Sequence, residues 1–389
     1  MPTPASLVAP ASLITHRLRA GLVRSYWALV GDARLASRLG VAVLLLLATR
    51  FGMDSGVTYD EPLHHEYGNR ILAWYGSGFR DQSVLAFKEL HLYGGLFDLC
   101  AQWLIRLLPW DPYQSRHLLV ALLAVLGVVG TARLAARVGG EWAGFWAGFL
   151  LALTPAWVGH GLFNPKDVPF AVAAVFVTDA ALRLAQGTSP SRWRDTAWAG
   201  VTLGIALGVR PAGVFLVAYP LFASAARAVL EVSRRARAQQ PLRVPTELAA
   251  LLARVAVLII IAWALMLIGW PWAQLSPMAR PLEAMQAFAH FASQGGVLFG
   301  GALVDSHALP WSYLPTWFAI SLPELYLVPL CCALVWLGLV LRARHMALER
   351  ALGVGVIALS VLLPLGTALV LRPVLYDAQR HFLFLYPPL

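Results

Sequence analysis

Long apolar runs recur along this chain, and most have about the 20 residues that a helix needs to cross the hydrocarbon core of a bilayer. We count nine of them, at 38–55, 117–135, 141–160, 169–186, 197–209, 211–228, 250–270, 314–341 and 351–371. Hydrophobic residues make up 59% and charged residues only 13% of the chain, whereas about 25% of a typical soluble domain is charged. This composition excludes a soluble enzyme, a disordered scaffold and a disulfide-stapled secreted module. The predicted fold class is an all-α, polytopic membrane helical bundle of about nine or ten spans.

Three of the predicted spans are irregular. The run at 197–209 is short and rich in glycine, which predicts a partial or kinked span. The eighth run contains Pro323 and Pro329 and is expected to bend. A tenth helix begins at Phe382 and stops at Leu389, which suggests a truncated C-terminus. No strand-like alternation is evident, so the chain divides into a tail, 1–37, and one membrane module, 38–389.

The basic residues predict which side of the membrane each loop occupies. With the N-terminal tail in the cytoplasm, 19 of the 30 Lys and Arg residues fall on the inner side, as the positive-inside rule expects. Most histidines and carboxylates then fall on or near the outer face, and these side chains carry proton-transfer and ligand chemistry. We therefore expect a protein of the inner (cytoplasmic) membrane whose active site faces outward.

The net charge of +10 does not indicate a nucleic-acid partner. Nucleic-acid binding needs basic residues gathered on one face, whereas here they separate the apolar runs. No nucleic acid is expected to bind.

Ionisable residues crowd the segment directly after the first span. Within eight positions it contains Tyr59, Asp60, Glu61, His64, His65 and Glu66. A carboxylate held partly dehydrated at the membrane surface becomes more basic, so Asp60 is a candidate general base. The alternative is that Asp60 only caps the helix that starts at Pro62.

The outer loop at 55–116 contains two amphipathic pieces, Pro62–Tyr75 and Leu90–Leu108. Their length and mixed polarity predict helices that lie along the membrane surface and cover the outer ends of the spans. Lys88 and Glu89 precede the second piece, where a solvated surface is the alternative to a functional role. Arg116 opens the second span.

Three further polar groups are expected at the outer ends of spans. Lys166 and Asp167 lie between two prolines in a rigid turn, for which an exposed turn with a weak ion pair is the alternative. Arg210 is costly to bury unless it is paired, and its natural partner is a phosphate or lipid headgroup. Arg380 and His381 are adjacent phosphate donors, or they snorkel to the interface.

In this order the landmarks resemble the glycosyltransferase-C (GT-C) superfamily, and most closely its branch of protein O-mannosyltransferases and lipid A aminoarabinose transferases. The landmarks are Asp60-Glu61 after the first span, the outer loop ending at Arg116, Asp167 after the third span and Arg380-His381-Phe382. The resemblance implies that 38–389 is a GT-C-like catalytic module. It also implies a sugar donor linked through phosphate to a polyprenyl lipid.

The resemblance further implies roles for particular residues. Asp60 would activate the acceptor, Glu61 would orient the acceptor or the sugar, and Asp167 would fix the sugar or, in some branches, a divalent ion. Other substrate-binding candidates, the first four of them for the donor phosphate, are Arg116, Lys166, Arg210, Arg380, Tyr59, His64, His65, Glu66, Glu89 and His381.

The cofactor and the substrates are less defined. No cofactor is certain, and a divalent cation held by Asp60 and Asp167 stays open. The Lys-Pro-Pro run frequent in the family is replaced here by Lys88-Glu89-Leu90-His91, which leaves the sugar and the acceptor (glycan, lipid or protein) open.

Two other functions were weighed against this one. A transporter or lipid flippase would show inverted repeats and ionisable groups near the membrane midplane, and neither is evident. A non-catalytic assembly subunit would not explain Asp60, Glu61 and Asp167. The predicted function is therefore a membrane glycosyltransferase whose partners are a polyprenyl-phosphate sugar, an acceptor and membrane lipids.

Overall fold

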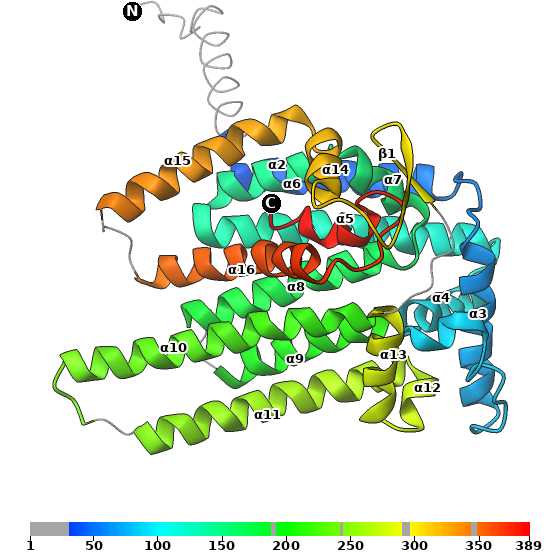
Figure 1. The fold of residues 1–389 in the computed structure, drawn as a ribbon, viewed down its shortest axis with the longest axis horizontal. Coiled ribbons are helices and arrows are strands. Elements are labelled where there is room, and N and C mark those ends of the chain that lie inside the picture. Colours follow the sequence, from blue (N-terminus) through cyan, green and yellow to red (C-terminus); the bar gives the residue numbers. More distant parts are fainter. Residues whose placement is uncertain (1–30, 188–191, 242–243, 290–295, 344–347) are drawn as a thin grey trace, which may run out of the picture.

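The computed structural model describes residues 31–187, 192–241, 244–289, 296–343 and 348–389. In these ranges the chain is a bundle of helices with one short β-hairpin (Figure 1). Six helical segments are long and apolar enough to cross a membrane: α2 (Ala33–Gly52), α5 (Pro112–Gly139), α8 (Asp167–Gln186), η2 with α10 (Pro211–Val217 and Ala218–Arg237), α11 (Val244–Ile268) and α16 (Leu348–Leu371). The predicted polytopic helical bundle is confirmed.

Two further spans are broken by proline. Helices α6 (Glu141–Ala152) and α7 (Pro155–Phe163) meet at 67°. Helix α14 (Tyr313–Ser321) meets η3 (Glu324–Tyr326) and α15 (Leu327–Ala343) at about a right angle, 100°. Thr154 and Leu322, the residues before Pro155 and Pro323, are both extended, the conformation that a following proline favours. The bend at Pro323 was predicted, whereas the break before Pro155 was not.

By length and apolarity alone, six helices of the described residues could cross a membrane, or up to eight if each bent pair is one span. The predicted fifth span, 197–209, lies in α9 (Arg192–Val209), which packs against α8 and α11. Three of its 18 residues are charged, Arg192, Arg194 and Asp195. These charges keep α9 below the apolarity of the other spans.

One end of the bundle is covered by surface helices, which we call the roof: α3 (Glu61–Gly76), η1 (Lys88–Leu92) and α4 (Leu96–Leu107) (Figure 1). Short helices α12 (Pro271–Gln274) and α13 (Ala279–Ala289) lie beside it. The predicted amphipathic pieces are confirmed, although the second α-helix begins at Leu96. Gly95 donates from its backbone N–H to the carbonyl of Gly269, 2.8 Å away, so the roof is fixed to the end of α11.

The prediction that the chain lacks strands was wrong. Strands β1 (Gly296–Phe299) and β2 (Ala302–Asp305) form an antiparallel hairpin in which Gly296 pairs with Asp305. Gly300 and Gly301 make its turn with φ of +60° and +81°, which a tight hairpin turn requires and glycine adopts readily. The expected helix from Phe382 is a short 3-10 helix, η4 (Arg380–Leu385).

Helix α8 is the centre of the bundle. It packs against α5, α9, α10 and α16, and 83% of its apolar stretch is buried.

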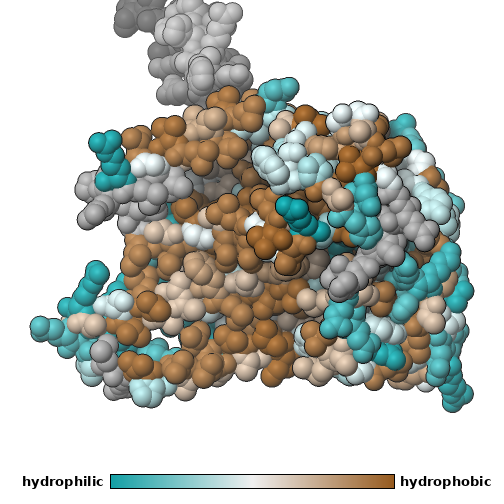
Figure 2. Space-filling model, viewed as in Figure 1, coloured by the Kyte–Doolittle hydropathy of each residue, from teal (hydrophilic) through white to brown (hydrophobic). Residues whose placement is uncertain are grey.

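Apolar side chains cover the middle of the molecule, and hydrophilic ones gather at its two ends (Figure 2). Exposed Trp103 and Trp110 lie at the roof end, and exposed Trp142 and Trp193 lie at the opposite end, as in the aromatic belts of membrane proteins. Asp167 begins α8 beneath the roof.

Candidate active site

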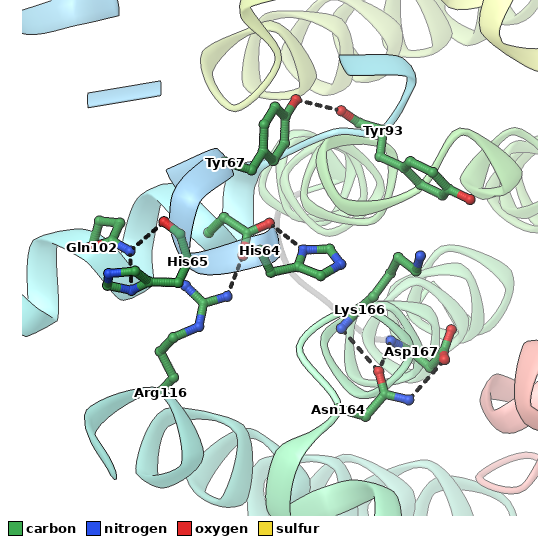
Figure 3. Close-up of polar contacts among 10 residues, drawn as sticks. His64, His65, Tyr67, Tyr93, Gln102, Arg116, Asn164, Lys166 and Asp167 are labelled. Carbon is green, nitrogen blue, oxygen red and sulfur yellow. Dashed lines mark hydrogen bonds and ion pairs between the residues drawn. The ribbon is translucent and has the colours of Figure 1, made fainter. Parts of the chain in front are cut away.

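Asp167 is fixed by a turn that Asn164 closes. The Asn164 side-chain oxygen accepts the backbone N–H groups of Lys166 and Asp167 at 3.1 and 2.8 Å, and its amide nitrogen donates to Oδ2 of Asp167 at 2.8 Å (Figure 3). Asp167 is only 3% exposed. The exposed-turn alternative for this segment is therefore wrong.

Two arginines from distant parts of the chain neutralise Asp167. Arg210, directly before η2, places Nη2 2.6 Å from Oδ1 of Asp167, and Arg380 places Nε 3.3 Å from Oδ2. The pairing explains how Arg210 is buried, because a charged group loses its hydration there unless it meets an opposite charge.

Arg380 also reaches the segment after the first span. Its Nη1 lies 3.8 Å from Oδ2 of Asp60 and 3.0 Å from Oδ2 of Asp377. Asp60 stands at the N-cap position of α3, but its side chain accepts no hydrogen bond from the helix, and 44% of that side chain is exposed. The side chain therefore does not serve as a cap, and one polar centre contains Asp60, Arg380 and Asp167.

Lys166 and His381 border this centre. Nζ of Lys166 lies 4.3 Å from the centroid of the Tyr93 ring, a cation–π contact. Burial, reinforced by nearby Arg210, lowers the pKa of Lys166 to about 8. Burial and Arg210 also lower the pKa of His381 to about 3, so this imidazole is neutral at pH 7. The cations of this centre among the described residues are therefore Lys166, Arg210 and Arg380.

The Glu61 side chain makes buried contacts within the protein. It is 1% exposed, and its Oε1 accepts the backbone N–H and the hydroxyl of Thr58 at 2.6 and 2.8 Å. Its Oε2 meets Nε2 of His117, at the start of α5. Burial raises the pKa of Glu61, but the hydrogen bonds from His117 and Thr58 outweigh burial and hold it below its usual value. Glu61 thus ties the roof to a span.

A second buried pairing joins the roof to the bundle. Asp98 of α4 lies 2.9 Å, through Oδ2, from Nδ1 of His64, and its Oδ1 meets Nη2 of Arg116 (Figure 3). Burial raises the pKa of Asp98, but His64 and Arg116 together lower it below its usual value. Arg116 is only 1% exposed, so the structure gives this predicted phosphate contact a carboxylate partner instead.

The other candidates lie outside the polar centre. Gln102 donates to Nδ1 of His65 at 2.9 Å, and Glu66 pairs with Arg70 at 2.8 Å. Tyr59 is 90% exposed, and Glu89 is exposed on η1. The substrate-binding roles of these residues stay predictions.

Sequence reasoning assigned no role to Asn164 or Tyr93, and it noted Asp98, His117 and Asp377 only as polar residues of the outer face. Asn164 stands three residues before Asp167, a spacing typical of a side chain that accepts backbone N–H groups in a turn. The partners of Asp98 and His117 depend on how the roof packs, which no local pattern encodes.

No group of three or more His, Cys, Asp and Glu side chains in the described ranges is arranged to hold a metal ion. The guanidinium group of Arg380 lies between Asp60 and Asp167, the two carboxylates considered for a divalent cation. A cation at this position stays a prediction.

Comparison with known proteins supports the fold. No protein-family model matches the chain, and no curated protein matches it. Among solved structures it is similar to ArnT from Cupriavidus metallidurans, a structure bound to undecaprenyl phosphate, with a TM-score of 0.55 and 16% identity. The match covers 90% of this chain and 57% of the ArnT chain, so the present chain spans little more than half the length of ArnT. The likeness shows that this chain shares the fold of the matched part of ArnT.

Proposed function

We propose that this chain is a membrane glycosyltransferase that moves a sugar from a polyprenyl-phosphate donor to an acceptor. The observation that carries the proposal is the position of Arg380, within 4 Å of both the half-exposed Asp60 and the buried Asp167. An accessible carboxylate beside a cluster of cations is what glycosyl transfer from a phosphate-linked donor needs. The likeness to a structure that holds undecaprenyl phosphate supports the donor class.

Asp60 acts as the general base in this mechanism. It accepts the proton of an acceptor hydroxyl or amine while that oxygen or nitrogen attacks C1 of the sugar. The bond from C1 to the phosphate oxygen breaks, and its electron pair leaves with the polyprenyl phosphate. A single displacement of this kind inverts the anomeric centre.

Lys166 and Arg380 stabilise the leaving phosphate. Arg presents a planar fork to two phosphate oxygens, and Lys adds a point charge. Asp167, held between Arg210 and Arg380, orients both guanidinium groups. Arg210 thus acts mainly through Asp167.

In this proposal the polar centre faces the outer side of the membrane. The excess of Arg in the loops opposite the roof supports a cytoplasmic N-terminus and a roof on the outer face of the inner membrane. Among the described residues this polar centre lies at the roof end of α8, whereas a transporter would be expected to place it near the midplane. The acceptor is a glycan, lipid or protein, and the branch is that of the aminoarabinose and O-mannosyl transferases.

Binding of the lipid carrier tests the proposal without knowledge of the sugar. Purified protein in nanodiscs is titrated with undecaprenyl phosphate and, separately, with undecaprenol. We expect the phosphate to bind at least tenfold more tightly, since charge-assisted contacts contribute about 1.5–3 kcal/mol. Equal binding of both lipids would contradict the proposal. Transfer is then assayed with a panel of undecaprenyl-phosphate sugars, and Asp60→Asn serves as the inactive control.

A further inference from the structure

A second charged pocket lies at the end of the bundle opposite the roof. It is formed where α8 ends, α9 begins and α10 and α11 pass, and four arginines line it: Arg183, Arg192, Arg227 and Arg254. Since α8 begins at Asp167 and rises about 1.5 Å per residue over 20 residues, the two sites are about 30 Å apart. The pocket therefore has no part in the polar centre under the roof.

The four arginines that line this pocket outnumber its carboxylates by one. Three carboxylates line it, but Glu247 pairs at 3.1 Å with Arg235, which is not part of the lining. Asp195 and Glu231 lie 3.7–3.8 Å from Arg183, Arg192 and Arg227, beyond normal hydrogen-bond length. The guanidinium N–H groups can therefore still donate to another anion.

Arg227 and Arg254 show most clearly that the pocket can accept another anion. Nη1 of Arg227 donates to the Gln186 carbonyl at 3.1 Å and to Glu349 at 3.4 Å, whereas its buried Nε has no hydrogen-bond partner in the part of the chain that the structure describes. Arg254 forms no ion pair within 4.0 Å among the described residues; it is close enough to Arg192 for the two charges to repel, and attraction to Glu247 offsets only part of that repulsion. An anion placed between these side chains would relieve that repulsion.

The surroundings of the pocket are those of a membrane interface. Trp193, next to Arg192, is 52% exposed, and exposed tryptophans mark the headgroup level of a bilayer. Leu248 and Leu252 of α11 are 51% and 60% exposed, and they stand beside Glu247 and Arg254 in the sequence. A ligand with one anionic group and apolar chains fits both features.

We propose that this pocket binds the phosphate of an anionic phospholipid headgroup. The cavity is about 30 Å³, room for about two waters, so phosphate oxygens can enter it while the glycerol and acyl chains stay outside. Basic pockets between spans are typical sites for anionic lipids. Binding here is independent of the proposed transferase activity.

Lipid titration followed by native mass spectrometry tests the site. Full-length protein in detergent is titrated with phosphatidylglycerol and with zwitterionic phosphatidylcholine. We expect wild-type protein to prefer phosphatidylglycerol and Arg254→Gln to lose about tenfold or more of that affinity. Arg254→Lys, which keeps the charge but not the planar fork, should lose less affinity than Arg254→Gln. The exposed Arg350, at the same end of the bundle in α16, gives the matched control Arg350→Gln, which should leave the preference intact.

Two further arms separate the alternatives. Arg380→Gln removes a cation from the polar centre under the roof, and it should not change the phosphatidylglycerol preference. Inorganic phosphate at millimolar concentration should not displace the lipid. The proposal is overturned if Arg254→Gln binds as wild type does, if Arg350→Gln or Arg380→Gln loses as much affinity, or if inorganic phosphate competes fully.

Discussion

Nη1 of Arg380 lies 3.8 Å from Oδ2 of Asp60, although the two residues stand near opposite ends of the described chain. The same guanidinium group contacts Asp167 through Nε. A cation that bridges an accessible and a buried carboxylate can neutralise the buried one and stay available to a substrate phosphate. This bridge underlies the first two predictions.

Replacement of Asp60 by Asn should remove activity and leave the fold intact. Loss of a positioned general base typically costs about 10²–10⁴-fold in rate. The fold should survive because the Asp60 side chain makes no capping hydrogen bond. Turnover with a polyprenyl-phosphate sugar and thermal unfolding in detergent measure the two effects. Near-normal turnover would show that Asp60 is not the base.

Replacement of Arg380 by Lys should weaken use of the donor. A lysine keeps the charge but cannot contact two oxygens at once. Loss of one charge-assisted contact should raise the donor KM about 10–150-fold, or about 1.5–3 kcal/mol. Donor titration at fixed acceptor checks this, and the same titration of Arg350→Lys is the control. An unchanged donor KM with a raised acceptor KM would reverse the assignment of the two faces.

The affinity for undecaprenyl phosphate should fall as the pH rises through about 8. The pKa of Lys166 is lowered from 10.5 to about 8, so its positive charge is complete below that pH and disappears above it. Binding curves from pH 6.5 to pH 9.5 measure the effect. Lys166→Arg stays charged over this range and should remove the pH step. A step of the same size in that variant would assign the titration to another group.

Replacement of Glu61 by Gln should destabilise the protein at neutral pH. The change weakens a buried hydrogen bond to His117, which costs about 1–3 kcal/mol. Because the pKa of Glu61 is lowered from 4.5, the stabilisation is complete above pH 4.5 and is lost as the pH falls through the lower folded value. Thermal unfolding should therefore show a large difference in Tm between the variant and wild type at pH 7. The difference in Tm should be smaller at the lowest pH that the protein tolerates. The exposed Glu89 gives the control Glu89→Gln, which should unfold as wild type does.

The sequence predicted the helical architecture because membrane spans are a local property. Length and apolarity identify α5, α8 and α11 without any knowledge of what packs against them. The predictions of secondary structure failed where a single residue breaks or turns the chain, because hydropathy averaged over a window does not register single residues. Pro155 breaks a continuous apolar run, and Gly300-Gly301 turn a short stretch into a hairpin.

The candidate site was predicted residue by residue but not as a set of contacts. Asp60, Asp167 and Arg380 were each named from their place at the end of a span, and the structure brings them together. Arg116 was expected at the phosphate and pairs with Asp98 instead. Which carboxylate meets which arginine depends on the packing of segments far apart in the sequence, and composition carries no information about it.

The polar centre needs Arg380, a residue that is synthesised late. Synthesis from the N-terminus delivers Asp60 and Asp167 to the membrane well before residue 380 leaves the ribosome. Until then Asp167 has Arg210 as its arginine partner, and Asp60 lacks the guanidinium group that later joins the two. The nascent chain can thus complete most of its spans while the centre is unassembled. The order of synthesis therefore makes Arg380 the last of these three residues to reach the polar centre.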